Sequence, residues 1–140
     1  VSAFLLNRFP ILASGDITTL YSKIENLEQK SSTNTFTKTS DITGSCSVDF
    51  KRKGNVVNIT YSFDSPQLSS WQSLKIGSFA NTFGALWNAE STPHISRITT
   101  YQPVYVQYKK ADNSLYMQNS SGNTINAMQQ VAGEIIVLCE

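Results

Sequence analysis

The feature that most constrains this chain is a short stripe of apolar residues at helical spacing, followed by a long series of alternating segments. After Asp16, apolar side chains recur every three or four residues, at Ile17, Leu20, Ile24 and Leu27. This spacing places all four side chains on one side of a helix, in the arrangement of a coiled-coil seam. The pattern therefore predicts a short oligomeric stalk joined to a β-rich head.

Charged positions in the predicted stalk favour a parallel association. Asp16 can accept hydrogen bonds from the free N–H groups of the first helical turn. With Ile17 at heptad position a, Lys23 falls at g and Glu28 at the following e, where opposite charges of neighbouring parallel helices meet. About two heptads are too short to hold chains together alone, so the head must contribute to assembly. The alternative interpretation is an amphipathic helix packed on its own domain.

The residues after the stalk change from a polar stretch to a β-hairpin. Residues 32–43 are almost wholly Ser, Thr, Asn and Lys, a composition that predicts an extended neck. From Cys46 to Phe63, apolar and polar residues alternate on both sides of Gly54 and Asn55. We expect this Gly-Asn pair to supply positive φ angles in a tight turn between two antiparallel strands.

Short strands continue to the end of the sequence. A second hairpin is predicted for 104–118, turning through Asp112 and Asn113, and a short strand for 125–128. The closing run 134–139 is apolar enough to predict a central strand, whereas 71–98 favours short strands and long loops. About eight strands indicate a mainly β fold with an antiparallel sandwich or jelly-roll-like head. The predicted organisation is an N-terminal segment (1–15), a coiled-coil helix (16–31), a neck (32–43) and a β head (44–140).

Composition and charge exclude several classes of partner. The 140 residues have a formal net charge of +1, so no overall field attracts nucleic acid. No apolar run approaches the roughly 20 residues that a membrane-spanning helix requires. We therefore expect neither nucleic-acid binding nor membrane insertion.

Catalysis finds little support in the sequence, and no metal site or cofactor is expected. The chain has a single histidine, His94, and no G-x-S-x-G, phosphate loop or metal-spaced His/Cys cluster. A glycosidase needs only two carboxylates, and the candidates are Asp49, Asp64, Glu90, Asp112 and Glu134. Cys46 and Cys139 lie in the first and last strands of the predicted head, where a disulfide is geometrically possible, but reduced core thiols are favoured.

Aromatic residues give the stronger functional indication. Sugar rings present apolar C–H faces that stack on Trp or Tyr, while nearby polar groups bind the hydroxyls. The same aromatic residues also fill sandwich cores and subunit interfaces, which is the alternative for each of them. The predicted saccharide site consists of Trp71, Trp87, Tyr105 and Tyr116, with His94, Arg97, Asp112 and Asn113 as polar loop residues.

Five features occur together in this chain: the predicted helical coil, the Ser/Thr-rich neck, the hairpin Cys-Ser-Val-Asp-Phe-Lys-Arg-Lys-Gly-Asn-Val-Val-Asn-Ile-Thr-Tyr from Cys46, the step Trp71-x-x-Leu74-x-Ile76-Gly77, and the closing Gly-Glu-Ile-Ile-Val strand. Together they resemble the C-terminal part of the receptor-binding proteins that tailed phages of Gram-positive bacteria carry at the tail tip or baseplate. The resemblance implies a homotrimer of the virion that recognises host cell-wall saccharides without catalysis or a cofactor. Related heads often have a Pro-rich loop after the Trp and Gly step, and this chain has no proline in 78–83.

Other functions make different structural predictions. A structural tail-fibre or baseplate component that docks another tail protein would expose a broad apolar patch. A polysaccharide hydrolase would bring two carboxylates together in a pocket. A TNF-like trimeric ligand is compatible with the head but not with the phage-like neck. For the stalk itself, Ile at heptad position a and Leu at position d favour a coiled coil of two helices. A trimer therefore requires the head to determine the number of chains.

Overall fold

The computed structural model describes residues 17–22, 33–96 and 103–140. The chain divides into two units, Val1–Lys30 and Ser31–Glu140, which we describe separately. In the first unit, 17–22 form a helix that exposes Ile17, Leu20 and Tyr21. The remaining stalk residues, including Asp16, Ile24 and Leu27, lie outside the described residues, so the coiled coil stays a prediction. Among the described residues, we find no helix with the length and hydropathy needed to cross a bilayer.

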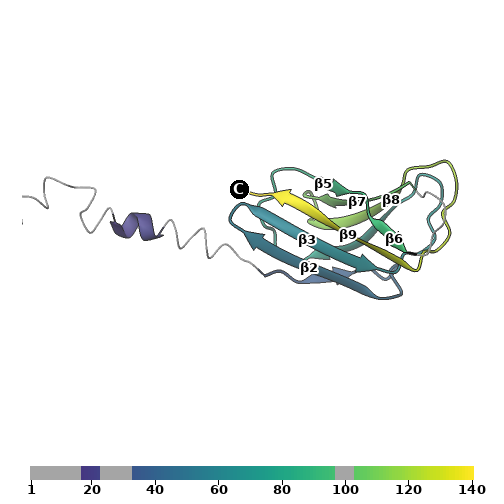
Figure 1. Ribbon diagram of the computed structural model, residues 1–140, viewed down its shortest axis with the longest axis horizontal. Coiled ribbons are helices and arrows are strands. Elements are labelled where there is room, and N and C mark those ends of the chain that lie inside the picture. Colours follow the sequence, from purple (N-terminus) through teal and green to yellow (C-terminus); the bar gives the residue numbers. More distant parts are fainter. Residues whose placement is uncertain (1–16, 23–32, 97–102) are drawn as a thin grey trace, which may run out of the picture. The chain divides into compact units, whose positions relative to one another are not determined.

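The second unit confirms the predicted mainly antiparallel β fold, with two sheets (Figure 1). The larger, sheet A, has the order β1-β4-β8-β7-β5, and sheet B has the order β2-β3-β9-β6. The strands are β1 (Phe36–Lys38), β2 (Cys46–Lys53), β3 (Val56–Phe63), β4 (Ser73–Phe79), β5 (Ala89–Ser91), β6 (His94–Ser96), β7 (Val104–Lys109), β8 (Ser114–Asn119) and β9 (Gln130–Leu138).

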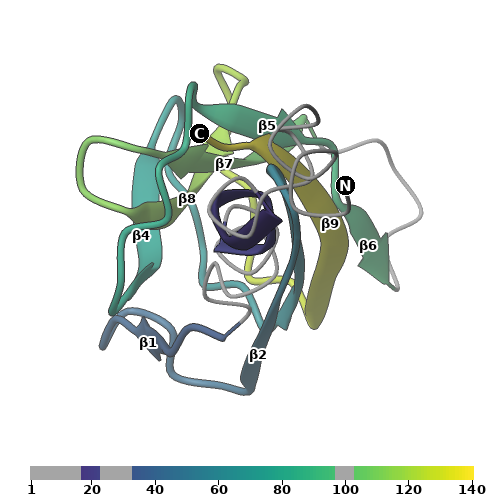
Figure 2. The same ribbon diagram turned by 90° about the vertical axis from the view of Figure 1, so that its left-hand side faces the viewer.

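The core lies between the two sheets, which Figure 2 shows end-on with β4 and β8 opposite β2 and β9. Strict alternation along β3 turns Val57, Ile59, Tyr61 and Phe63 inward, as a strand with one solvated face requires. The inward residues of β7 and β8 meet them from sheet A. They are Val104, Val106, Tyr108, Leu115 and Met117.

Both predicted hairpins are confirmed. In the first, β2 and β3 pair from Cys46 opposite Phe63 to Lys53 opposite Val56. Gly54 has the expected positive φ of 59°, whereas Asn55 does not have a positive φ. The turn therefore uses a positive φ at only one of its two residues. In the second hairpin, β7 pairs with β8 throughout.

Three segments differ from the expectation. The closing strand β9 is internal in sheet B, between β3 and β6, but Ile136 and Leu138 are about half exposed, because alternation turns them to the solvent face. Residues 125–128 form no strand, only an isolated bridge through Ile125. Part of the expected neck belongs to the head, since β1 pairs with β4 and Ile42 is buried.

The head has two ends, which we call the entry end and the far end. At the entry end, the N–H of Ala80 donates to the carbonyl of Thr35 at 2.8 Å, and the Asn34 amide donates to the carbonyl of Asn81 at 2.6 Å. The last residues of β9 also lie there (Figure 1). Strand β4 begins at Ser73 and leads to Ala80, so the loop before Ser73 lies roughly 20 Å away at the far end.

Candidate functional site

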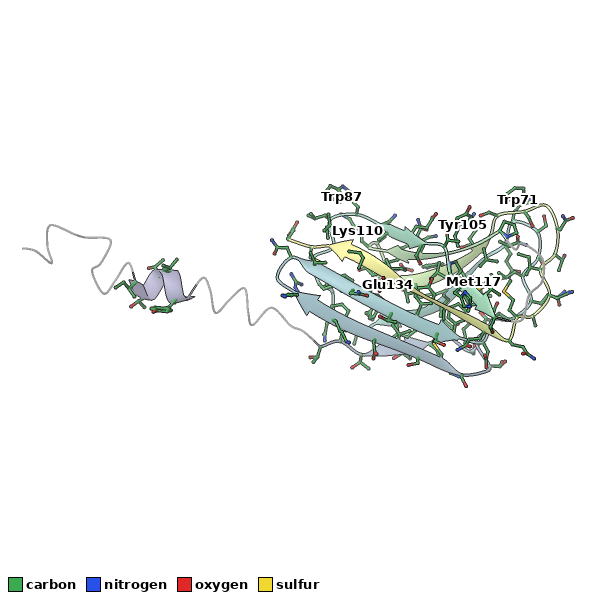
Figure 3. The ribbon with its side chains drawn as sticks, in the orientation of Figure 1. Trp71, Trp87, Tyr105, Lys110, Met117 and Glu134 are labelled. Carbon is green, nitrogen blue, oxygen red and sulfur yellow. The ribbon has the colours of Figure 1, made fainter. Side chains whose placement is uncertain are left out.

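Trp71 stands at the far end, in the turn that precedes β4 (Figure 3). Its side chain is 65% exposed, and its φ of 59° lies in the left-handed region that residues other than glycine rarely adopt. The Trp71 N–H donates to the carbonyl of Ser121 at 3.0 Å. The indole Nε1 is 3.9 Å from where a Cβ on Gly122 would lie. The backbone is thus held in place while the ring remains open to solvent.

Asn119 fixes the two loops that surround Trp71. Its side chain is fully buried at the end of β8. The Asn119 amide nitrogen donates to the carbonyls of Ser69 at 3.0 Å and Asn123 at 2.7 Å. Its oxygen accepts from the Ser121 N–H at 3.1 Å and from the Ser121 hydroxyl at 2.8 Å. One buried amide therefore joins the loop before β4 to the loop after β8.

The outer face of sheet A carries polar and aromatic side chains in register. Successive strands bring these residues side by side because outward positions of paired strands face one another. The two rows are Lys75, Tyr116, Gln107 and Glu90, and, nearer the far end, Ser73, Gln118 and Tyr105. The second row is the one that continues toward Trp71.

Tyr116 is already engaged by its neighbours on this face. Its hydroxyl donates to the Asp112 carboxylate, which raises the pKa of Tyr116 because the hydrogen bond favours the protonated phenol. Lys75 Nζ lies 3.6 Å from the same carboxylate, and Lys109 Nζ lies 4.2 Å from the centre of the Tyr116 ring. This cluster orders the surface, and it leaves less of the Tyr116 ring for stacking than Trp71 offers.

Asn113 serves the fold. It is buried in the β7–β8 turn with a φ of 55°. Its amide nitrogen donates to the carbonyls of Phe79 at 3.1 Å and Asn81 at 2.9 Å, and its oxygen accepts from the Tyr108 hydroxyl at 2.7 Å. Since its side chain is used to join this turn to the end of β4, we leave Asn113 out of the candidate site.

The other residues of the predicted site are spread over the head. Tyr105 is half-buried on the outer face of sheet A, and Trp87 is exposed at the entry end (Figure 3). His94 is exposed on β6, opposite Ala132 in sheet B. Arg97 lies outside the described residues. The structure therefore gathers Tyr105, Asp112 and Tyr116 on one face that Trp71 adjoins, but not His94.

Two open hollows lie elsewhere on the described surface. One, of about 550 Å³, is lined by Asp64, Ser96, Met128, Gln129 and Gln130. The other, of about 400 Å³, is lined by Thr60, Tyr61, Ser62, His94, Ala132, Gly133 and Glu134. Each contains one carboxylate, whereas the usual glycosidase arrangement requires two.

Neither a disulfide nor a metal cluster is found among the described residues. Cys46 and Cys139 do not form a disulfide with each other, and β3 lies between the strand of Cys46 and β9. Burial raises the pKa of the Cys46 thiol. Within 17–22, 33–96 and 103–140, no three His, Cys, Asp or Glu side chains gather as a metal site would require.

Sequence reasoning missed Asn119, which positions Trp71, and the polar partners Gln107 and Gln118 on sheet A. Gln107 and Gln118 alternate with buried residues in their strands, so the period-2 pattern could have placed them on the outer face. The Asn119 role depends on loop geometry that has no local pattern. Comparisons of the chain with protein-family models, with curated proteins and with solved structures found no match.

Proposed function

We propose that the chain is a non-catalytic adhesion module that binds a host cell-wall saccharide with the far end of its β head. The observation that carries this proposal is Trp71, a 65% exposed indole whose backbone is fixed by Ser121 and whose flanking loops are joined by buried Asn119. A preorganised aromatic face is suited to the C–H face of a sugar ring, because little conformational freedom is lost on binding.

Polar groups around Trp71 supply the hydrogen bonds that a sugar needs. Asn123 and Gly122 are exposed in the loop beside the indole, and Gln118 and Tyr105 lie across β8 and β7 on the adjoining face. Carbohydrate hydroxyls bind amide, hydroxyl and backbone groups of this kind. The proposed site therefore extends from Trp71 onto the near part of sheet A.

The position of the site agrees with a receptor-binding role. Trp71 lies at the end of the head opposite Thr35, and its indole is 65% exposed, so a surface ligand can reach the ring from that end. We place the protein at the tail tip or baseplate of a virion that infects Gram-positive bacteria, as a homotrimer that works outside the cell. Three weak sites on one assembly gain avidity because later contacts form at high effective concentration.

A second candidate is a structural tail-fibre or baseplate component that docks another tail protein. The observation that favours it is a group of exposed apolar side chains on sheet B, Val56, Ile136 and Leu138. For a polysaccharide hydrolase, the third possibility from the sequence, neither of the two hollows above offers a pair of carboxylates.

The two tryptophans of the chain allow a direct test, because each can be kept as the only tryptophan, whose emission is then recorded. In Trp87→Ala, the remaining Trp71 should change its emission when soluble polysaccharide fragments released from Gram-positive cell walls are added. In Trp71→Ala, Trp87 should not respond, and binding measured by calorimetry should weaken about tenfold or more, as for truncation of a central aromatic contact.

The matched pair also serves as the control. Trp71 and Trp87 are 65% and 66% exposed, so a general effect of losing an exposed indole would appear in both variants. Equal affinity of Trp71→Ala and wild type for every fragment tested would count against the site. Undiminished binding to cell walls stripped of polysaccharide would count against the ligand class.

A further inference from the structure

Exposed large apolar side chains in the described part of the head are divided between its two ends. Trp71 is the one at the far end. The other four lie toward the entry end and are Val56, Trp87, Ile136 and Leu138, with exposed fractions of 40%, 66%, 52% and 49%. Several such side chains gathered on an otherwise polar surface indicate an interaction site.

Strand pairing makes the aliphatic members of this group neighbours on the outer face of sheet B. Val56 on β3 pairs with Leu138 on β9, and Ile136 is the preceding outward residue of β9. On the other side of β9, the N–H of Leu86 donates to the carbonyl of Leu138 at 2.9 Å, which places half-buried Leu86 beside Leu138. We call Val56, Leu86, Ile136 and Leu138 the β3–β9 patch.

Lysines flank the patch on two sides. On β2, outward Lys53 pairs with Val56, and Lys51 is the preceding outward residue. On the opposite side, Lys110 Nζ donates to the carbonyl of Leu86 at 3.1 Å. All three lysines are exposed. The distance from β2 across β3 and β9 to Leu86 is three strand spacings, or roughly 14 Å. The patch is therefore an apolar strip with positive charge at both of its sides.

Carboxylates lie beyond the patch in the other direction, along the strand. Glu134 stands two residues before Ile136 on the outer face of β9, and Glu140 stands two residues after Leu138. Both are exposed. Because two residues of a strand span only roughly 7 Å, an anionic membrane lying on the patch would also meet these carboxylates. A narrow protein segment can instead place its own charges to match the pattern.

Trp87 follows Leu86 and lies beside the patch. The N–H of Lys110 donates to the Asn88 side chain at 2.9 Å, so the chain is held on both sides of Trp87. The indole is 66% exposed and lies near Lys110 (Figure 3). A partner that covers the patch would therefore come close to this ring, which makes Trp87 a reporter of its binding.

We propose that the β3–β9 patch is the docking site for an amphipathic helix of another protein, whose apolar stripe has acidic residues on both sides. A helix is about 10–12 Å across, which suits the strip between Lys53 and Lys110. Its apolar stripe packs on the aliphatic side chains, as helices pack on sheet faces within domains. Its carboxylates meet the lysines at the rim of the contact, where opposite charges favour one orientation.

The test uses the full 140-residue chain carrying Trp71→Ala, so that Trp87 is the only tryptophan. Two synthetic peptides of about 18 residues, long enough to form a helix, share one stripe of leucines. Glutamates flank the stripe in the first peptide and lysines flank it in the second. The glutamate peptide should bind at least about tenfold more tightly by calorimetry, change the emission of Trp87, and lose affinity as salt is added.

Charge reversal tests the part played by the lysines. Lys53→Glu should weaken the glutamate peptide and reduce its preference over the lysine peptide about tenfold or more. The control is Lys38→Glu, at an exposed position of β1 outside the patch, which changes the net charge equally and should keep the preference. Ile136→Ser should weaken both peptides because an apolar contact is lost. Circular dichroism should show that the variants are folded, and Leu138→Ser replaces Ile136→Ser if that one is not.

Other occupants of the patch give different results. Equal affinity for the two peptides, or equal effects of Lys53→Glu and Lys38→Glu, would overturn the proposal. Binding to vesicles of phosphatidylcholine and phosphatidylglycerol that is lost in Ile136→Ser would assign the patch to a membrane instead. Self-association in sedimentation velocity that is lost in Ile136→Ser would assign it to a second copy of the chain, and either result would overturn the helix.

The inference rests on the docking role proposed above as the second candidate function, and it can fail separately from the saccharide site. Affinity for soluble cell-wall fragments should be the same in Lys53→Glu and in wild type, since Trp71 is at the other end of the head. Peptide binding without any fragment binding would support the docking surface and contradict the saccharide site. Fragment binding without a preference for the glutamate peptide would do the reverse.

Discussion

Trp71 adopts a backbone conformation that would be less costly for a glycine. A residue with a Cβ in the left-handed region is destabilised by about 1 kcal/mol or more, yet Trp71 has a φ of 59°. Asn113, at 55°, is a residue type that tolerates this region, and its side chain makes three hydrogen bonds there. The mostly exposed indole of Trp71 makes no comparable set of stabilising contacts in the folded head. This is consistent with a role of Trp71 in binding.

The backbone cost at Trp71 can be measured by comparing two substitutions. Both Trp71→Ala and Trp71→Gly remove the indole, so the two variants differ only by the Cβ atom. Glycine is usually the less stable choice, but at a positive φ the order reverses. We expect the free energy of unfolding of Trp71→Gly to exceed that of Trp71→Ala by about 1 kcal/mol, measured by urea denaturation. The usual order, with Ala more stable, would show that the turn relaxes to another conformation.

At the scale of elements, the far end depends on contacts between loops, because 121–123 belong to no strand. The four hydrogen bonds of the Asn119 side chain join this loop to Ser69. Its removal would leave buried backbone groups without partners, which costs more than the net value of the bonds themselves. Asn119 is therefore a positioning residue for Trp71, although it does not reach the surface.

Asn119→Ala should lower the free energy of unfolding by about 2 kcal/mol and weaken the binding of soluble cell-wall fragments. The readout specific to positioning is hydrogen exchange at the Trp71 N–H, which donates to Ser121. This exchange should accelerate much more than exchange in β3. Gln67→Ala, at an exposed position in the same loop region, is the control and should change neither quantity. Equal acceleration throughout the head would indicate general destabilisation only.

At the scale of the whole molecule, the sequence predicts the positions of the strands and turns better than it predicts which side chains are exposed. The two hairpins follow from alternation and turn residues, which are local properties. The exposure of Ile136 could not be predicted, because the run from Ile135 to Leu138 has no polar residue to reveal which side chains face out. The exposure of Val56 could be predicted, since Val56 is out of phase with the inward-facing Val57 and Ile59.

The predicted saccharide site shows the same limit. Asp112 and Tyr116 come together because one hairpin carries both, but Trp71 and Trp87 lie at opposite ends, which the order of residues does not determine. Their distinct roles in the proposals above depend on which loops the sheets bring to each end. Strand topology decides this, and it is a non-local property.

The core between the two sheets should make the head sensitive to alkali. Tyr61 from sheet B and Tyr108 from sheet A are almost fully buried, and burial raises the pKa of both phenols. In the unfolded chain they ionise near pH 10, while in the folded head their raised pKa keeps them protonated to higher pH. The folded state then binds more protons, so stability is unaffected below about pH 10 and falls as the pH rises above it.

Each tyrosine should contribute a slope of up to about 1.4 kcal/mol per pH unit above pH 10, measured by urea denaturation at a series of pH values. Tyr108→Phe should remove one such contribution. Its stability at pH 8 should fall by about 1 kcal/mol because Asn113 loses the hydrogen bond from the phenol. Tyr61→Phe, which loses a hydrogen bond with Ser91, should flatten the slope similarly. An unchanged slope in both variants would mean that other groups cause the alkaline unfolding, since replacement of either ring by Phe leaves the packing between the sheets intact.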